Sequence, residues 1–349
     1  VQGDMPVYDL RSVFNPTLYP RKYPDKVVGT GGAAWFELMD LLDNDVEVAR
    51  FRRAGINTLA FTILYDLDDS GVPVIKRSKE AANLIIRAKI RGFAVFVNLD
   101  TFTNQIPCSG SYEDNRASWH DIERRAAVAL ATFAQQLNVE YISPDNESES
   151  GLQGDCLDPL YSQTSGRDPY QQMLDPLGEE GFTARVGVMS AWHVELLPAL
   201  REIFDGKIIA HFGNSHPEIY VPEYDGLTFT LDHGHLSAEQ FRAHVRTDYL
   251  SADSAARESG DIQWMTWAYL PFSLEADFND PEHPDYDPNY QPDPVEDQRM
   301  LEMQQVYIQA SVDELPDLRG YILQGWLDKG LEIRGSEAEV ILSNTFGTS

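Results

Sequence analysis

Residues 77–100 read RSKEAANLIIRAKIRGFAVFVNLD, and this stretch holds one complete step of the predicted fold. Apolar residues from Ala81 to Ala88 recur at the spacing of one face of an α-helix. Gly92 is a natural helix end, because glycine readily takes the left-handed conformation that closes a helix. The run from Phe93 to Asp100 is almost continuously apolar, as in a strand that is buried on both faces. The stretch therefore predicts a helix that leads directly into a buried parallel strand.

The same alternation of apolar runs and amphipathic stretches extends over most of the chain. Helices are expected between the strands, among them residues 118–138, with Ser118 as the N-cap. The eight predicted strands are residues 27–38, 55–66, 93–100, 139–147, 207–214, 224–235, 261–272 and 318–330. Eight such units favour an α/β protein with a closed (β/α)8 TIM barrel. A doubly wound open sheet is the alternative, but no glycine-rich phosphate-binding fingerprint follows any predicted strand.

One domain is expected for residues 1–349, because no proline- or serine-rich linker divides the chain. The barrel core is predicted at residues 27–330. The segment 273–297 is rich in Asp and Pro and falls between the seventh strand and its helix. We expect an insertion there over the C-terminal mouth of the barrel, where functional loops gather. Its acids are compatible with Ca²⁺ binding, although a solvated, proline-stiffened loop fits them better.

The formal net charge of −29 limits the partners that the chain can take. Such a surface repels nucleic acids and anionic membranes, so we expect neither as a partner. No stretch approaches the roughly 20 apolar residues that a membrane span needs. The first residues lack an initiating Met, which is compatible with a processed, secreted chain and equally with a trimmed one. The acidity fits adaptation to high salt as well as an ordinary acidic secreted protein.

Two cysteines, Cys108 and Cys156, are too few for a metal cluster of their own. In an oxidising compartment they could form a disulfide, but the sequence does not give the distance between them. The sequence indicates no cofactor and no bound metal, and we expect a secreted monomer.

In an α/β barrel the chemistry lies at the carboxyl ends of the strands. Here acids, amides, histidines and aromatic residues end the predicted strands. Aromatic rings stack on the C–H faces of sugars and polar side chains bind the hydroxyls, so this mixture favours a saccharide-binding mouth. The expected substrate-binding residues are Trp35, Tyr65, Asn98, Asn146, His211, His233, Trp267, Tyr269 and Trp326.

The fourth predicted strand runs into EYISPDNESESG at residues 140–151, where Asn146 and Glu147 stand at the strand's end. In this position, within an eight-fold βα alternation, the pair resembles the clan A glycoside hydrolases, which include endo-galactanases, endo-mannanases and cellulases. GINTLAF in the second strand, TLDHGH in the sixth, and the last helix with its Trp-bearing eighth strand are similar to parts of the same clan. The resemblance covers roughly residues 27–330 and implies a barrel that cleaves glycosidic bonds.

The resemblance implies that Glu147 is the general acid/base, that Asn146 binds the hydroxyl next to the cleaved bond, and that Trp326 stacks on a sugar. Glycoside hydrolysis needs one protonated carboxyl group and a second, ionised one. A Glu at a strand end, beside apolar walls and further acids, is well placed for a raised pKa. Asp145 and Glu149 are better interpreted as solvated loop acids.

The chain departs from the clan's pattern at the seventh strand, where Trp267 occupies the position of the nucleophilic Glu. Asp232, at the end of the sixth strand, is the first candidate for the second carboxylate, because a strand end is held more rigidly than a loop. Glu275, eight residues after Trp267, is the other candidate. A gap of about 6.5–9.5 Å to Glu147 would indicate an inverting mechanism, and a gap of about 5 Å a retaining one.

The main prediction is a hydrolase of a polysaccharide or oligosaccharide, and the length of the 273–297 loop favours endo-action. Two alternatives stay open. A non-catalytic carbohydrate-binding barrel is favoured by the missing Glu of the seventh strand. A metal-dependent isomerase or hydrolase would use His211, Asp232, His233 and His235, although a cluster from one strand end is weak support for zinc.

Overall fold

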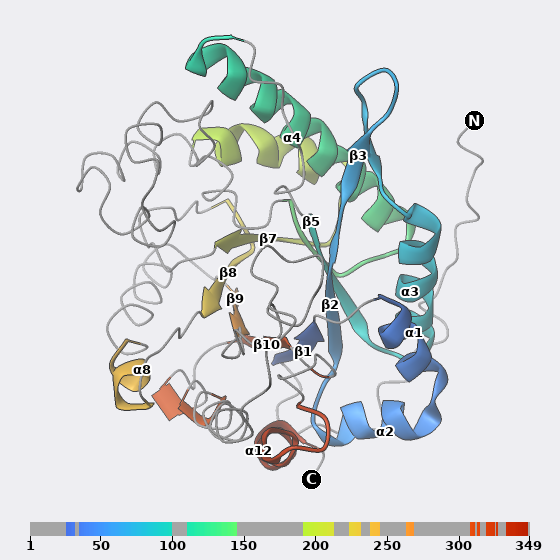
Figure 1. Ribbon diagram of the computed structural model, residues 1–349, viewed down its shortest axis with the longest axis vertical. Coiled ribbons are helices and arrows are strands. Elements are labelled where there is room, and N and C mark those ends of the chain that lie inside the picture. Colours follow the sequence, from blue (N-terminus) through green and yellow to red (C-terminus); the bar gives the residue numbers. More distant parts are fainter. Residues whose placement is uncertain are drawn as a thin grey trace, which may run out of the picture.

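A computed structural model gives the arrangement of the chain (Figure 1). The residues that the structure describes are 26–31, 35–99, 110–144, 191–212, 223–231, 238–244, 263–268, 308–310, 313–314, 319–324, 326 and 333–347.

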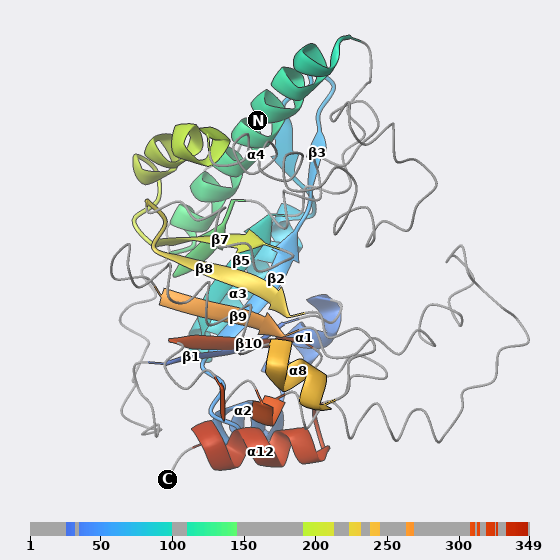
Figure 2. The same cartoon turned by 90° about the vertical axis from the view of Figure 1, so that its left-hand side faces the viewer.

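Parallel strands pair side by side into a ring at the centre of the molecule (Figures 1 and 2). The strands of the ring are β1 (Val27–Gly31), β2 (Thr58–Ile63), β5 (Ala94–Leu99), β6 (Tyr141–Ser143), β7 (Lys207–Phe212), β8 (Gly226–Leu231), β9 (Gln263–Ala268) and β10 (Gly320–Gln324). Each pairs in parallel with its neighbours in chain order, and β1 also pairs with β10, which closes the ring. The predicted α/β class and the parallel arrangement are confirmed.

The first strand is shorter than the sequence predicts. The apolar run 27–38 predicts one strand, but β1 ends at Gly31 and helix α1 (Trp35–Asp43) begins soon after it. Leu38 and Leu42 of this helix are both buried, one helical turn apart. The second half of the run therefore follows the period of a helix, which continuous apolar character alone does not reveal.

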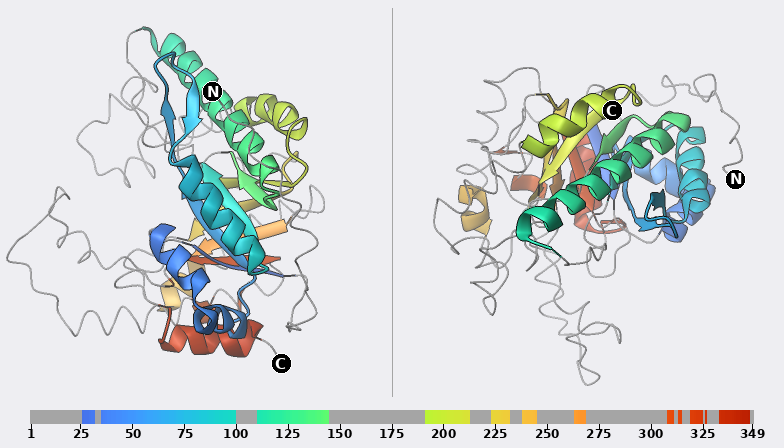
Figure 3. Two further views of the ribbon diagram at one scale, coloured as in Figure 1. Left: turned by 90° about the vertical axis from the view of Figure 1, so that its right-hand side faces the viewer. Right: turned by 90° about the horizontal axis from the view of Figure 1, so that it is seen from above.

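Helices cover the outside of the ring (Figures 1 and 3). They are α1, α2 (Asp45–Arg53), α3 (Ser78–Ile90), α4 (Tyr112–Gln136), the helical residues 191–201, α8 (Ala238–His244) and α12 (Glu337–Phe346). The predicted helix before β5 is confirmed as α3, and Gly92 beyond its end takes a φ of 76°. None of the described helices combines the length and apolar character that a membrane crossing requires.

Helix α4 begins at Tyr112, upstream of the predicted start at residue 118. Its N-cap is Ser111 instead of Ser118. The Ser111 hydroxyl accepts a hydrogen bond from the backbone N–H of Asp114, and the Asp114 carboxylate accepts one from the backbone N–H of Ser111. This reciprocal capping box satisfies two backbone donors at once, which explains why the helix starts there.

Two separate apolar cores follow from the alternation of side chains along the strands. The interior of the ring holds Val27, Ala60, Phe96, Ile209 and Ile322, with Tyr141 packed against them. A larger core lies between the strands and the helices, and it includes Val95 and Val97 on either side of Phe96. Strand β5 is therefore buried on both faces, as its continuous apolar sequence predicts.

Helices α2 and α12, from an early and a late part of the chain, lie side by side outside the ring (Figures 1 and 2). Arg334, just before α12, donates two hydrogen bonds to the Glu47 carboxylate of α2, at 2.5 and 2.9 Å. Arg50 of α2 binds Glu339 of α12 at 2.7 Å. Glu47 is 5% exposed, and the hydrogen bonds from Arg334 hold the pKa of its carboxyl below the ordinary value.

A hairpin of two antiparallel strands, β3 (Tyr65–Leu67) and β4 (Pro73–Ile75), follows β2 directly. It projects beyond the ring together with one end of α4 (Figures 1 and 3). Pro73 is buried, and Arg125 of α4 donates a hydrogen bond to the carbonyl oxygen of Gly71 at 3.0 Å. An isolated hairpin is only marginally stable, so this contact with α4 is what supports it.

The contact between α2 and α12 can be tested at Gly55, which follows α2. Gly55 has a φ of +80°, and a Cβ there would lie 2.5 Å from backbone atoms of Phe346 in α12. Gly55→Ala adds left-handed strain of about 1–2 kcal/mol and overpacking of about 1–3 kcal/mol. We expect urea unfolding to show a loss of roughly 2–5 kcal/mol in the free energy of unfolding.

Gly71→Ala is the matched control for this substitution. Its φ is +75°, but no atom lies within 4 Å of the added Cβ, so only the backbone strain remains. Equal losses of stability in the two variants would contradict the close packing of α12 against the end of α2.

Candidate functional site

Polar residues lie next to the apolar interior of the ring, on the side of the strands' carboxyl ends. Because side chains alternate, the residue two positions after an inward-facing residue faces inward again. Five strands carry a polar residue two positions after an apolar residue of the interior. These residues, which we name the polar layer, are Thr62, Asn98, Ser143, His211 and, by its position on β10 alone, Gln324.

Asn98 and His211 meet inside the ring. The Asn98 Nδ2 atom lies 2.6 Å from the His211 Nδ1 atom, and the two residues are 1% and 2% exposed. Asn98 lies on β5 and His211 on β7, so the contact spans β6, whose Ser143 is in register with Asn98. The structure therefore brings together two of the predicted substrate-binding residues.

The predicted catalytic residues Glu147, Asp232 and Glu275 lie outside the described residues. Two of them follow a strand closely in the sequence. Strand β6 ends at Ser143, four residues before Glu147, and β8 ends at Leu231, directly before Asp232. Outside the described residues are also Asn146, His233 and Tyr269. The roles of these six residues stay predictions.

Two predicted aromatic residues are placed by the backbone only. Trp35 is the first residue of α1, so it belongs to a helix and does not end β1. Trp267 lies in β9, where it is in register with Ile322 of β10 and Thr230 of β8. It stands one residue before the end of the seventh strand of the ring, at Ala268, so the departure from the clan's pattern remains at this position.

Tyr65 is buried in the outer core, contrary to the prediction of a substrate contact. Strand β2 ends at Ile63, and Tyr65 begins β3. Its side chain is 1% exposed in the outer core, and its hydroxyl donates a hydrogen bond to the Glu123 carboxylate of α4 at 2.5 Å. This correction arises because the chain turns into the hairpin at the point where the sequence predicts a longer strand.

Trp326 is also a core residue in this structure, where the sequence predicts a platform for a sugar ring. Only 1% of it is exposed, and its ring centroid lies 4.7 Å from that of Phe51 in α2. Strand β10 ends at Gln324, so the inward and outward alternation of the strand no longer applies at Trp326. The indole is directed to the helix layer and leaves no open face for a saccharide.

A seam of aromatic and histidine side chains lies between α4 and the helical residues 191–201. His120 of α4 stacks on Trp192, with ring centroids 5.7 Å apart and planes at 18°. The pKa of His120 is lowered to about 4. Burial is the largest cause, and the nearby Arg116 and His193 make smaller contributions in the same direction. In the sequence, the only signs of this seam are the adjacent pairs Trp119–His120 and Trp192–His193, which lie on separate helices.

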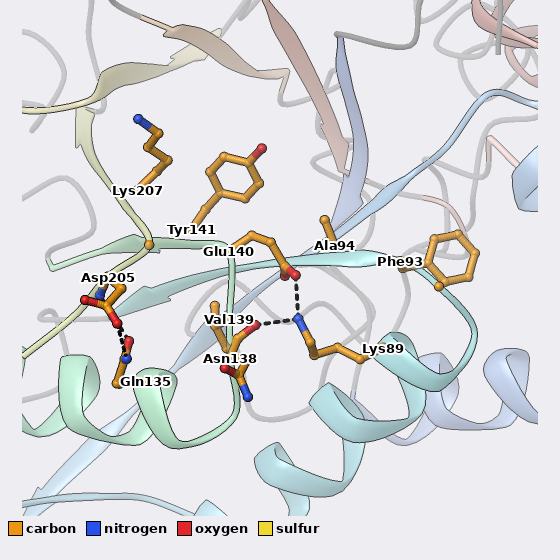
Figure 4. Close-up of a pocket in the computed structure, with 12 residues that line it drawn as sticks. Lys89, Phe93, Ala94, Gln135, Asn138, Val139, Glu140, Tyr141, Asp205 and Lys207 are labelled. Carbon is orange, nitrogen blue, oxygen red and sulfur yellow. Dashed lines mark hydrogen bonds and ion pairs between the residues drawn. The ribbon is translucent and has the colours of Figure 1, made fainter. Parts of the chain in front are cut away.

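A cavity of about 610 Å³ opens at the opposite face of the ring, at the amino ends of β5, β6 and β7 (Figure 4). Lys89 there binds the carbonyl oxygen of Asn138 and the carboxylate of Glu140. The second oxygen of Glu140 accepts a hydrogen bond from the backbone N–H of Val95 at 2.9 Å. These contacts join the end of α3 to the starts of β5 and β6.

Gln135 and Asp205, which also line this cavity, make a reciprocal contact. The Gln135 amide donates to the Asp205 carboxylate at 2.8 Å, and the backbone N–H of Asp205 donates back to the Gln135 side chain at 3.0 Å. The polar groups thus bind one another across three helix-to-strand junctions. Because the amino face of such a barrel commonly serves stability, we interpret this cavity as part of the scaffold.

Within the part of the chain that the structure describes, no three His, Cys, Asp or Glu side chains are grouped so that they could hold a metal. The metal-dependent alternative relies on His211 together with Asp232, His233 and His235, and only His211 is described. Cys108 and Cys156 also lie outside the described residues. Neither the metal-dependent alternative nor the disulfide is tested by these contacts.

Comparison with solved structures identifies the fold. A GH113 β-1,4-mannanase aligns with a TM-score of 0.53 at 13% sequence identity, over 92% of this chain and 97% of that chain. The GH113 β-mannanase AaManA from Alicyclobacillus acidocaldarius gives 0.51 at 14% identity, over 92% and 96%. A β-glucuronidase from an uncultured Clostridium sp. gives 0.52 at 10% identity, over 91% of this chain and 50% of that chain.

No model of a protein family matches the sequence, and a search of curated proteins by sequence finds no match. At 10–14% identity, the likeness to the solved structures shows the fold alone. The resemblance to clan A glycoside hydrolases that the sequence predicts is confirmed as a likeness of fold.

The buried hydrogen bond of Tyr65 should contribute to the stability of the chain. Tyr65→Phe removes the hydroxyl that donates to the buried Glu123 carboxylate, and we expect a loss of about 1–3 kcal/mol in the free energy of unfolding. Urea unfolding measures this loss, and a variant that keeps full stability would contradict a stabilising hydrogen bond between Tyr65 and Glu123.

The His120 seam predicts a loss of stability in acid. The pKa of His120 is about 4 in the folded chain, against an ordinary histidine value of 6.5, so between these pH values only the unfolded chain takes up the proton. Stability from this group is therefore complete above about pH 6.5 and is lost as the pH falls toward 4.

Urea unfolding of the wild type and of His120→Gln, at about pH 7 and about pH 4.5, measures this effect. The variant should be less stable than the wild type at neutral pH, and its stability should fall less in acid, by up to about 3 kcal/mol. An equal fall in both proteins would show that His120 does not carry the effect.

Proposed function

We propose that this chain is a glycoside hydrolase built on one complete (β/α)8 barrel, a single domain over residues 1–349. The observation that carries the proposal is the polar layer, which faces the carboxyl ends of the strands in a ring that follows chain order. Counted around this ring, β6 is the fourth strand, and it is followed by Asn146 and Glu147.

The likeness of fold supports the same reaction class. Two of the structural neighbours are described as β-1,4-mannanases, and they cover nearly the whole chain. We therefore take β-1,4-linked mannan as the first substrate to test, followed by other polysaccharides. We further propose extracellular action on such a polymer by a secreted monomer, and endo-action, which the length of the 273–297 segment favours.

In the proposed mechanism, Glu147 protonates the leaving oxygen of the glycosidic bond. Asp232, at the end of the sixth strand, or Glu275 supplies the second carboxylate, which acts on the anomeric carbon directly or through a water. Asn146 and the side chains of the polar layer bind sugar hydroxyls, because buried donors and acceptors need partners once a substrate excludes water.

A non-catalytic carbohydrate-binding barrel is the second candidate. One observation favours it: Trp267 stands in β9 at the position where the clan carries its nucleophilic Glu. In that case the mouth would bind saccharide with no bond cleaved. The same proteins and substrates distinguish the two candidates.

Glu147→Gln tests the main proposal. The change removes the proton that cleavage needs but keeps the size and polarity of the side chain, so release of reducing ends should fall by about 10³-fold or more, while saccharide binding stays. Glu149→Gln, two residues later in the same segment, is the matched control and should keep wild-type activity.

Equal losses in both variants would contradict a specific role for Glu147. A wild type that binds several polysaccharides and cleaves none would establish the non-catalytic candidate. Activity that survives Glu147→Gln but disappears with a chelator would favour the metal-dependent alternative.

A further inference from the structure

We propose that Asn98 is a positioning residue that fixes His211 as a neutral imidazole with its proton on Nε2, so that His211 is a hydrogen-bond donor inside the barrel. The use of this donor, binding an acceptor oxygen of a sugar hydroxyl, rests on the proposed function. The state of the ring itself follows from the contact between the two side chains.

Because the Asn98 amide turns its nitrogen, and not its oxygen, toward the ring, the contact fixes which partner donates. The amide nitrogen of Asn98 lies 2.6 Å from Nδ1 of His211, within hydrogen-bond distance. An amide nitrogen carries two protons and no free lone pair, so it can only donate. Nδ1 of His211 must therefore accept, and it carries no proton. A neutral ring with an unprotonated Nδ1 holds its single proton on Nε2.

Burial makes the arrangement rigid and disfavours a charged ring. Asn98 and His211 are 1% and 2% exposed, and they stand on β5 and β7 at either side of β6. A second proton on the ring would place two donors against each other at Nδ1, in a site that excludes most water.

The layers of the ring explain why this pair lies there. Phe96 and Ile209, two positions before Asn98 and His211, belong to the apolar interior. The pair therefore lies directly on the carboxyl-end side of the apolar side chains of the interior. In that direction lie the strand ends from which Glu147 is predicted to act. A neutral His211 supplies a donor without competing for the proton of the general acid.

The ring state can be measured without any assay of activity. In histidine labelled with ¹⁵N, long-range proton–nitrogen NMR distinguishes a protonated ring nitrogen from an unprotonated one. His211→Gln identifies the signal by its loss. We expect the wild-type protein at about pH 7 to show Nδ1 unprotonated and Nε2 protonated. A proton on Nδ1, or a doubly protonated ring, would overturn the proposal.

Asn98→Asp tests the positioning role with an isosteric change. An aspartate carboxylate only accepts, so it should move the proton to Nδ1 or protonate both nitrogens. We expect about a tenfold lower kcat/KM on the cleaved polysaccharide and a changed pH profile, because the donor on Nε2 is lost or the ring gains charge. Thr62→Val is the matched control for the ring signals alone, since Thr62 is in register with Asn98 and belongs to the same layer.

Thr62→Val should leave the His211 ring signals unchanged. If Asn98→Asp changes neither the ring signals nor the pH profile, Asn98 does not position His211. If the ring signals are as expected and the wild type cleaves no saccharide, the proposed function fails while the positioning by Asn98 stands. The wild-type spectrum decides the ring state even if Asn98→Asp does not fold.

Discussion

Closure of the strand ring is the constraint on which the rest of the structure depends. Strand β1 pairs with β2 on one side and with β10 on the other, so residues from both ends of the sequence must meet. The ion pair between Arg334 and Glu47 holds the helices outside this junction together. Once the ring is closed, inward-facing side chains from different strands share one interior, and residues far apart in the sequence form common layers.

The apolar interior and the polar layer occupy successive levels of the ring. Apolar residues such as Phe96 and Ile209 fill one level of the interior, and polar residues occupy the next level toward the carboxyl ends. The amino face carries a cavity whose charged groups bind one another, as in the contact of Lys89 with Glu140. The two faces therefore differ in kind. One has polar groups that join helices to strands, and the other has the polar layer, in which Asn98 contacts His211.

Most of the fold is predictable from the sequence, because buried parallel strands leave continuous apolar runs and the helices keep their period. The errors occur where a local feature overrides that pattern. Ser111 starts α4 early through its capping box, and the run 27–38 changes from strand to helix after Gly31. For the site, Asn98 and His211 were predictable as strand-end polar residues. Their contact was not, because it depends on how far β7 is shifted along β6.

The two aromatic corrections share a cause. Tyr65 and Trp326 both follow a strand of the ring within two residues of its end, where the alternation of side chains stops and the sequence gives no direction. The proposed hydrolysis requires Glu147 and a second acid to face each other above the polar layer. The most direct measurement is a crystal structure with a bound oligosaccharide, in which the distances from the Glu147 carboxylate to those of Asp232 and Glu275 are read. We predict that one of these distances is about 5 Å or about 6.5–9.5 Å across the mouth. If both acids lie beyond about 10 Å or point away from the saccharide, the proposed mechanism is contradicted.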